Sequence, residues 1–174
     1  KQDEFTSNIV KRYSIHKGEV ALGYEEFAKT LAKNIDKFEF ITFDYGEKEA
    51  RTDYSLRIYH KHQVYPFFAL TPFVEDENEK PKGIELKDLF GKSDLTFDVN
   101  FSHLIDAFEE EGIKCHSYKT QMSMLVYFGV IDLLDMLLKN SDEKTYKDQM
   151  NKLKVLIDPA FMGERFKGVI FRKD

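Results

Sequence analysis

The pattern of hydrophobic and polar positions is clearest at residues 38–46, Phe-Glu-Phe-Ile-Thr-Phe-Asp-Tyr-Gly. Five of the first six residues are aromatic or β-branched, which is typical of a strand. The run therefore predicts a buried strand with Asp44 at its C-terminal edge. In open α/β sheets, ligands bind outside the carboxyl ends of the strands, so Asp44 is a candidate site residue. A core strand followed by an aspartate-containing turn is the alternative.

Amphipathic helices flank this strand in the sequence. Before it, apolar residues recur at the spacing of one helical face: Tyr24, Phe27, Ala28, Leu31, Ala32 and Ile35. A helix that leads directly into a buried strand is half of a βαβ unit, so this order predicts an α/β fold with a parallel sheet. Further along, Asn100 is suited to cap a second amphipathic helix, which Gly112 ends.

The C-terminal part of the chain is expected to complete the sheet. Two strands are predicted to pair antiparallel at its edge, residues 113–118 and 166–171. Between them, residues 122–138 form a continuous apolar helical stripe, which we expect to be buried on most sides and bent or divided at Gly129. Ser141 is expected to cap a further helix, which ends before Pro159.

The middle of the chain has a less regular pattern. Residues 54–62 alternate as a strand would, although a short helix also fits. Residues 64–73 carry two prolines and are predicted to be neither a helix nor a central strand. Aromatic residues here lie beside an acidic loop at 75–81, so the segment is either a lid or partner-binding edge, or a loop whose aromatics pack into the core.

Composition narrows the classes of function. The net charge of −5 argues against a general nucleic-acid binder. A single cysteine excludes an internal disulfide and indicates a reducing cytoplasm. His60 and His62 would share one face of a strand, but no third ligand lies at a supporting spacing, so no metal site is expected. The longest apolar run, residues 124–131, is shorter than the roughly 20 residues of a membrane helix, so no membrane partner is expected.

A set of short motifs follows the Asp44 strand in a familiar order. The motifs are Ser55-Leu56-Arg57-Ile58-Tyr59 with His62, Asp94-Leu95-Thr96 with Val99 and Phe101, Thr120-Gln121 with Gly129-Val130, and Asp158-Pro159 with Met162-Gly163 and Phe166-Lys167. Over residues 21–172 the chain resembles the C-terminal half of the MidA-like S-adenosylmethionine-dependent methyltransferases. That family includes the mitochondrial complex I assembly factor that methylates arginine.

The resemblance implies a Rossmann-like class I methyltransferase sheet with an antiparallel last strand and added helices. It implies catalytic roles for Asp44, Tyr45 and Asp94. It implies substrate-binding positions at His62, Thr96 and Gln121. The implied reaction is in-line methyl transfer to a guanidine nitrogen of a protein substrate, for which Asp44 and Asp94 would hold the guanidinium. A turn-capping role is the alternative for Asp94.

The chain also departs from the family pattern. No Gly-x-Gly loop with an acid on the following strand occurs in it. We therefore expect a single domain that is a fragment of a larger methyltransferase, is inactive alone, and leaves S-adenosylmethionine to be bound mainly by residues missing from this chain. Residues 64–91 are expected to be a loop insertion. A non-catalytic protein-binding or assembly module derived from the fold is the alternative, and an exposed sheet edge predicts self-association into a homo-oligomer.

Overall fold

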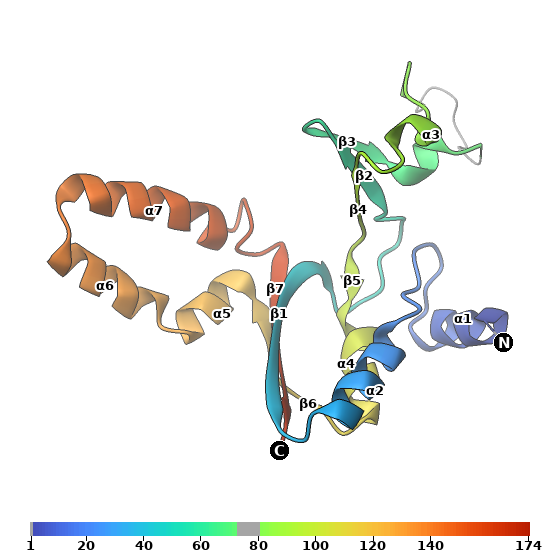
Figure 1. Ribbon diagram of the computed structural model, residues 1–174, viewed down its shortest axis with the longest axis horizontal. Helices are drawn as coiled ribbons and strands as arrows, with labels where there is room; N and C mark the ends of the chain where they lie inside the picture. Colours follow the sequence, from blue (N-terminus) through green and yellow to red (C-terminus); the bar gives the residue numbers. More distant parts are fainter. Residues whose placement is uncertain (1, 73–80) are drawn as a thin grey trace.

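The computed structural model describes residues 2–72 and 81–174, which form a mixed α/β structure (Figure 1). In chain order its elements are α1 (Gln2–Arg12), α2 (Tyr24–Asn34), β1 (Phe38–Glu47), β2 (Arg57–His60), β3 (Gln63–Pro66), the 3-10 helix η1 (Phe67–Leu70), α3 (Leu86–Leu89), β4 (Asp94–Thr96), β5 (Val99–Asn100), α4 (Phe101–Glu110), β6 (Lys114–Thr120), α5 (Gln121–Tyr127), α6 (Val130–Asn140), α7 (Glu143–Ile157) and β7 (Phe166–Lys173). The strand predicted around Asp44 is β1, and the helix predicted before it is α2.

The larger sheet has the strand order β5-β1-β7-β6. β7 runs antiparallel to β6, as predicted. It is an inner strand and not an edge strand, because it also pairs antiparallel with β1. β5 pairs in parallel with the end of β1, where Gly46 lies opposite Val99 and Glu47 lies opposite Asn100. The outer edge of residues 38–45 is therefore not paired with any described strand.

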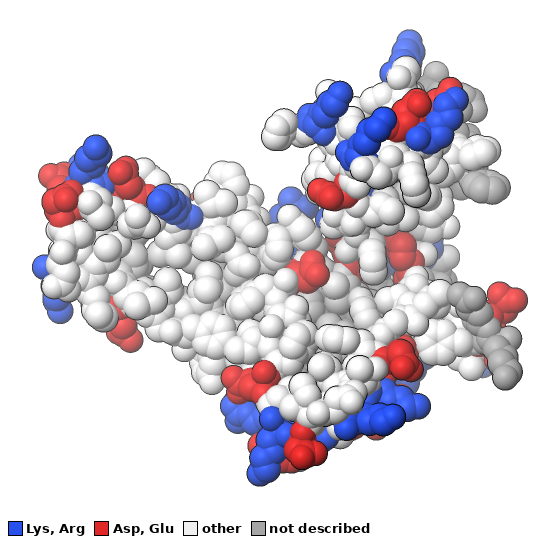
Figure 2. Space-filling model, viewed as in Figure 1, with Lys and Arg blue, Asp and Glu red and all other residues white. Residues whose placement is uncertain are grey.

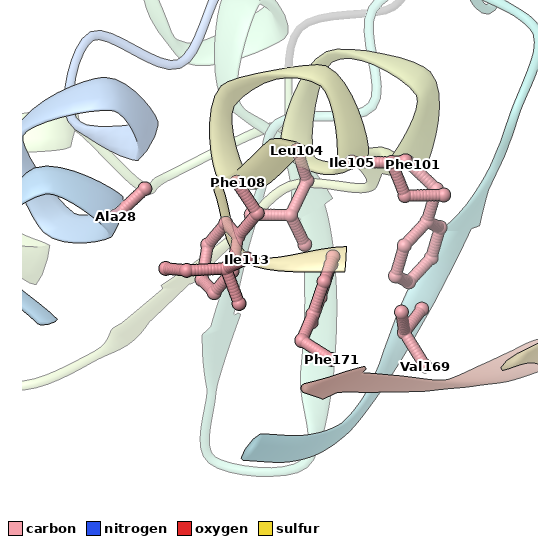
Figure 3. Close-up of a cluster of buried hydrophobic side chains, with 8 residues drawn as sticks. All are labelled: Ala28, Phe101, Leu104, Ile105, Phe108, Ile113, Val169 and Phe171. Carbon is pink, nitrogen blue, oxygen red and sulfur yellow. The ribbon is translucent and has the colours of Figure 1, made fainter. Parts of the chain in front are cut away.

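The main core lies between this sheet and helices α2 and α4. In Figure 3, side chains of α4 point onto the sheet, where the ring of Phe108 stacks on that of Phe171 with 4.2 Å between centroids. Phe40 of β1 stacks on the same Phe108 ring at 5.7 Å. The N-terminus of α4 is capped as predicted, because the side chain of Asn100 accepts a hydrogen bond from the backbone N–H of His103. The apolar stripes read from the sequence are thus the faces that meet the sheet.

A second, smaller sheet has the order β3-β2-β4 and is antiparallel throughout. Residues 57–60 form a strand and not a helix. This conformation buries Ile58 against Leu70 and Leu89, which stabilises the small sheet. Pro66 ends the edge strand β3, where a missing N–H is tolerated. Phe67 packs against this small core, which favours the packed-loop interpretation of that segment. The acidic residues 75–80 lie outside the described part of the chain.

Helices α5, α6 and α7 form an arm that projects from the sheet, which we call the helical arm (Figure 1). Gly129 divides α5 from α6 with φ of 86°, as predicted. The prediction that this stretch is buried on most sides was wrong, because none of the residues of α6 is buried. α6 extends away from the sheet and packs along α5 and α7.

The predicted cap of α7 also needs correction. Asp142 caps this helix, since its side chain accepts a hydrogen bond from the backbone N–H of Thr145. Ser141 instead ends α6, and its hydroxyl donates to the carbonyl of Leu137. Among the described residues no single helix is long and apolar enough to cross a membrane, whereas α5 and α6 pass that test together but are bent by 66°.

Candidate functional site

Asp44 lies half-buried near the carboxyl end of β1, opposite Lys167 of β7, and the strand continues three residues beyond the predicted end, to Glu47. One carboxylate oxygen, Oδ1, accepts a hydrogen bond from the backbone N–H of Tyr45 at 2.8 Å. Burial raises the pKa of Asp44, the Tyr45 hydrogen bond opposes that shift, and the nearby charges of Asp98 and Arg57 act in opposite directions. The carboxylate is poorly hydrated and is placed at the sheet edge where α/β proteins bind ligands.

Tyr45 follows Asp44 on the strand and therefore points to the opposite face of the sheet. Its ring lies 3.9 Å from the ring of Phe166, measured between centroids. Two guanidinium groups lie over it, those of Arg57 at 5.3 Å and Arg165 at 5.6 Å from the centroid. Asp44 and Tyr45, which were both predicted to be catalytic, therefore lie in different environments. The ring of Tyr45 already contacts two cations of this chain, Arg57 and Arg165.

Arg57 and Asp98 form the most enclosed ion pair near Asp44. Nη1 of Arg57 donates to Oδ1 of Asp98 at 2.8 Å, and Nη1 of Arg51 donates to Oδ2 of the same carboxylate at 2.8 Å. Nε of Arg57 donates to the hydroxyl of Tyr59 at 3.1 Å. Nη2 of Arg57 is buried and has no hydrogen-bond partner within the described residues. This pair joins β2 of the small sheet to the residue that precedes β5 of the large sheet.

A second set of hydrogen bonds holds the same junction from the other side. The carboxylate of Glu19 accepts from the backbone N–H groups of Ser55 at 2.8 Å and Leu56 at 2.6 Å. The hydroxyl of Ser55 donates to Glu19 and accepts from the backbone N–H of Asp98 at 2.8 Å. A cavity of about 20 Å³, bordered by Glu19, Asp98 and Asn100, lies beside these contacts. Such a volume admits about one water molecule and no nucleoside.

Comparison with known proteins identifies the family. The sequence profile of the S-adenosyl-L-methionine-dependent methyltransferase family matches residues 2–119, which is more than half of the chain. The chain belongs to this methyltransferase family. It is also 31% identical over 123 residues to the mitochondrial protein arginine methyltransferase NDUFAF7 of Danio rerio, covering 71% of this chain and 24% of that protein.

Solved structures support the methyltransferase fold. An uncharacterized protein from Burkholderia thailandensis superposes with a TM-score of 0.71 at 22% identity, over 95% of this chain and 42% of that one. A member of the same superfamily from the same organism, bound to S-adenosyl-homocysteine, gives a TM-score of 0.69 at 22% identity, over 94% and 41% of the two chains. The chain thus spans about a quarter of the curated relative and less than half of the solved structures. The predicted fold class and family resemblance are confirmed.

The remaining predicted site residues lie on other elements than Asp44. Asp94 is exposed on β4, and Thr96 ends the same strand opposite Arg57. His62 is exposed in the turn between β2 and β3, with φ of 64°. Gln121 begins α5, and its buried side chain donates from Nε2 to the carbonyl of Leu156, which holds α5 against the end of α7. The structure therefore puts the charges of Arg57 and Asp98 within reach of Asp44, and the site roles of Asp94, Thr96, His62 and Gln121 stay predictions.

The sequence had no simple signal for the Asp98, Ser55 and Glu19 contacts. These residues meet across separations of 36 and 43 positions, and no local period relates them. The one feature that distinguishes Asp98 is its position directly before β5, the short strand that pairs with the end of β1.

A glycine-rich loop that binds a nucleotide cofactor leaves its backbone open to the ligand. We therefore asked whether the most crowded glycines of this chain could contact S-adenosylmethionine in this way. A Cβ at Gly46 would lie 2.0 Å from the carbonyl oxygen of Val99, and one at Gly163 would lie 2.2 Å from that of Ile157. A Cβ at Gly168 would lie 2.7 Å from the ring of Phe43. These glycines permit close contacts of the chain with itself. Within the described residues they do not form a cradle for S-adenosylmethionine.

Proposed function

We propose that the full-length protein methylates arginine side chains of a protein, using S-adenosylmethionine, and that Asp44 holds the guanidinium. Support for the reaction comes from the family and from the relative whose name is protein arginine methyltransferase. Support for the residue comes from one observation, the half-buried carboxylate near the carboxyl end of β1. Family membership does not favour the alternative of a non-catalytic assembly module.

The chemistry gives Asp44 a definite task. S-adenosylmethionine supplies its methyl group on a sulfonium, and the attacking nitrogen must lose a proton when the new N–C bond forms. Binding a guanidinium stabilises a poorly hydrated carboxylate more than an exposed one, because charge-assisted hydrogen bonds replace the hydration that burial removed. Asp44 would therefore orient the guanidinium and blunt its positive charge before transfer.

Further residues are proposed for the same site on weaker grounds. Asp94 remains the second candidate carboxylate from the family resemblance, whereas both carboxylate oxygens of Asp98 are already paired, with Arg57 and Arg51. We propose that His62, Thr96 and Gln121 border the substrate, as the resemblance implies. We also propose that the cofactor is held mainly by residues outside this chain, since no Gly-x-Gly loop with an acid on the following strand occurs in it.

Methyl transfer by the full-length protein tests this proposal. The protein is incubated with methyl-labelled S-adenosylmethionine and a protein extract, and methylarginine is quantified after hydrolysis. Asp44→Asn keeps the shape of the side chain and removes its charge, and we expect a fall of about 100-fold in rate. Asp36→Asn is the matched control, because Asp36 is an exposed aspartate in the turn before β1. Full activity of Asp44→Asn would contradict the assigned role, and label recovered only in other amino acids would contradict the arginine substrate.

Calorimetric titration of the 174-residue chain with S-adenosyl-homocysteine tests the location of the cofactor site. We expect no binding by this chain and stoichiometric binding by the full-length protein. Stoichiometric binding by the chain alone would overturn the proposal that the cofactor is held elsewhere.

A further inference from the structure

The helical arm exposes an unusual amount of apolar surface. Ten large apolar side chains on the arm and in the segment that follows it are at least 40% exposed: Val126, Tyr127, Phe128, Ile131, Leu133, Met136, Leu138, Val155, Leu156 and Phe161. Figure 2 shows mostly uncharged surface along the arm, with its charged side chains gathered toward the outer end. Contiguous apolar surface on a folded protein marks an interface.

Helix α6 lies at the centre of this surface. Leu133 is 62% exposed and Met136 is 59% exposed, and because they are three positions apart they share one side of the helix. The polar stripe beside them carries Asp132 in the first turn, Asp135 in the middle and Lys139 in the last turn. The exposed side of α6 therefore has an apolar stripe next to a polar one whose two ends carry opposite charges.

We propose that this surface binds a second copy of the chain, with the two α6 helices packed antiparallel. In that arrangement Asp132 of each copy lies beside Lys139 of the other, and Leu133 and Met136 of both copies lie between these two charge pairs. The two Asp135 side chains lie near the two-fold axis and offset part of the gain. A two-fold axis repeats every contact, so the same charge pair forms twice. A parallel arrangement would instead place Asp132 beside Asp132 and is disfavoured by charge.

Two other occupants fit less well. A membrane surface attracts helices whose polar face is basic, whereas the polar stripe of α6 contains Asp132 and Asp135 with one lysine. Further strands of a longer methyltransferase would continue the sheet at the unpaired edge of β1. The arm connects β6 to β7, so it leaves the sheet at the opposite side from that edge. Strands added at that edge would therefore not cover the arm.

Sedimentation equilibrium of the chain over a range of concentrations tests the proposal. We expect a monomer–dimer equilibrium for the natural sequence. Asp132→Lys and Lys139→Glu should each raise the dissociation constant at least tenfold, because each places like charges together at both ends of the helix pair. The double variant restores opposite charges and should bring the dissociation constant back to within about threefold of the natural value. Lys152→Glu, the same charge change at an exposed position of α7, is the control and should leave association unchanged.

Several outcomes would overturn the proposal. These are a monomer at every concentration, an equal loss in the Lys152→Glu control, or a double variant no tighter than the single ones. Circular dichroism of each variant verifies that α6 is still formed. Flotation with phosphatidylcholine–phosphatidylglycerol vesicles addresses the other occupant, since vesicle binding by a chain that stays monomeric would replace the second copy with a lipid surface.

Discussion

Arg57 and Asp98 lie 2.8 Å apart, measured from Nη1 to Oδ1, and join the two sheets of this protein. The Arg57 side chain is 16% exposed and that of Asp98 is 13% exposed, so water screens the pair weakly. The charges of both side chains act on the pKa of Asp44, and the guanidinium of Arg57 lies over the ring of Tyr45, 5.3 Å from its centroid. The placement of the candidate site therefore depends on an ion pair formed between segments far apart in the sequence.

Removing Asp98 should destabilise the fold. Asp98→Ala leaves the poorly solvated guanidinium of Arg57 without its carboxylate, and breaking a largely buried pair costs about 3 kcal/mol. Urea unfolding followed by circular dichroism measures the change. The control is Glu143→Ala, which removes an exposed pair with Lys147 and should cost less than about 0.5 kcal/mol. Equal effects of the two substitutions would show that the Arg57–Asp98 pair does not hold the sheets together.

Gly46 is expected to tolerate no side chain. Its φ is 146°, and an added Cβ would lie 2.0 Å from the carbonyl oxygen of Val99 on the adjacent β5. Gly46→Ala must therefore separate β1 from β5 or change the backbone, at a cost of about 3 kcal/mol or more. Gly23→Ala is the comparison, because its φ is −124° and a Cβ there meets nothing within 4 Å. We expect a change below about 1 kcal/mol for Gly23→Ala in the same unfolding assay.

The aromatic stack in the core gives a third prediction. Phe108 is fully buried between Phe40 and Phe171, so Phe108→Ala should lower the free energy of unfolding by about 4 kcal/mol. Phe90→Ala makes the same chemical change at a side chain that is 89% exposed, and should change stability by less than about 0.5 kcal/mol. Thermal and urea unfolding of both variants measure the difference. A small effect at Phe108 would mean that the surrounding rings close the cavity.

The elements that the sequence predicted well are those with a strong hydrophobic period. β1, α2 and α4 were recognisable because each turns a regular apolar face toward the same core. The exposure of α6 could not be predicted, because its apolar stripe has the same period whether the helix is packed into a core or held away from it. Amphipathicity identifies a face that needs a partner and does not say whether the chain provides one.

Only one residue of the candidate site, Asp44, could be predicted from the sequence. Asp44 could be selected because it lies toward the carboxyl end of a strand in an α/β pattern, although β1 continues for three residues beyond it, to Glu47. Its neighbours Arg57 and Asp98 come from segments whose spatial relation depends on how the small sheet meets the large one. The aspartate selected from the motif, Asp94, is exposed on β4, four positions before the aspartate whose charge acts on Asp44.

The ionisation of Asp44 should make stability fall as pH rises. Burial raises the pKa of Asp44 in the folded protein, so between its ordinary value of about 3.9 and the raised value the folded state binds more protons than the unfolded state. The free energy of unfolding then decreases as pH rises through this window. Asn at this position does not titrate, so the stability of Asp44→Asn relative to the natural protein should increase with pH across the window and stay constant above it.

Urea unfolding at a series of pH values from about 2 to 7, which covers the range below the ordinary pKa of an aspartate as well as above it, measures this difference for Asp44→Asn. Asp142 is the matched control with the opposite sign, because the backbone N–H of Thr145 lowers the pKa of its carboxyl group at the start of α7. Stabilisation from Asp142 is present above about pH 3.9 and is lost as pH falls toward its lowered pKa. Asp142→Asn should therefore lose stability relative to the natural protein as pH rises, whereas Asp44→Asn gains it. The same trend for both variants would show that burial does not govern the pKa of Asp44, and would remove the physical basis for its affinity for a guanidinium.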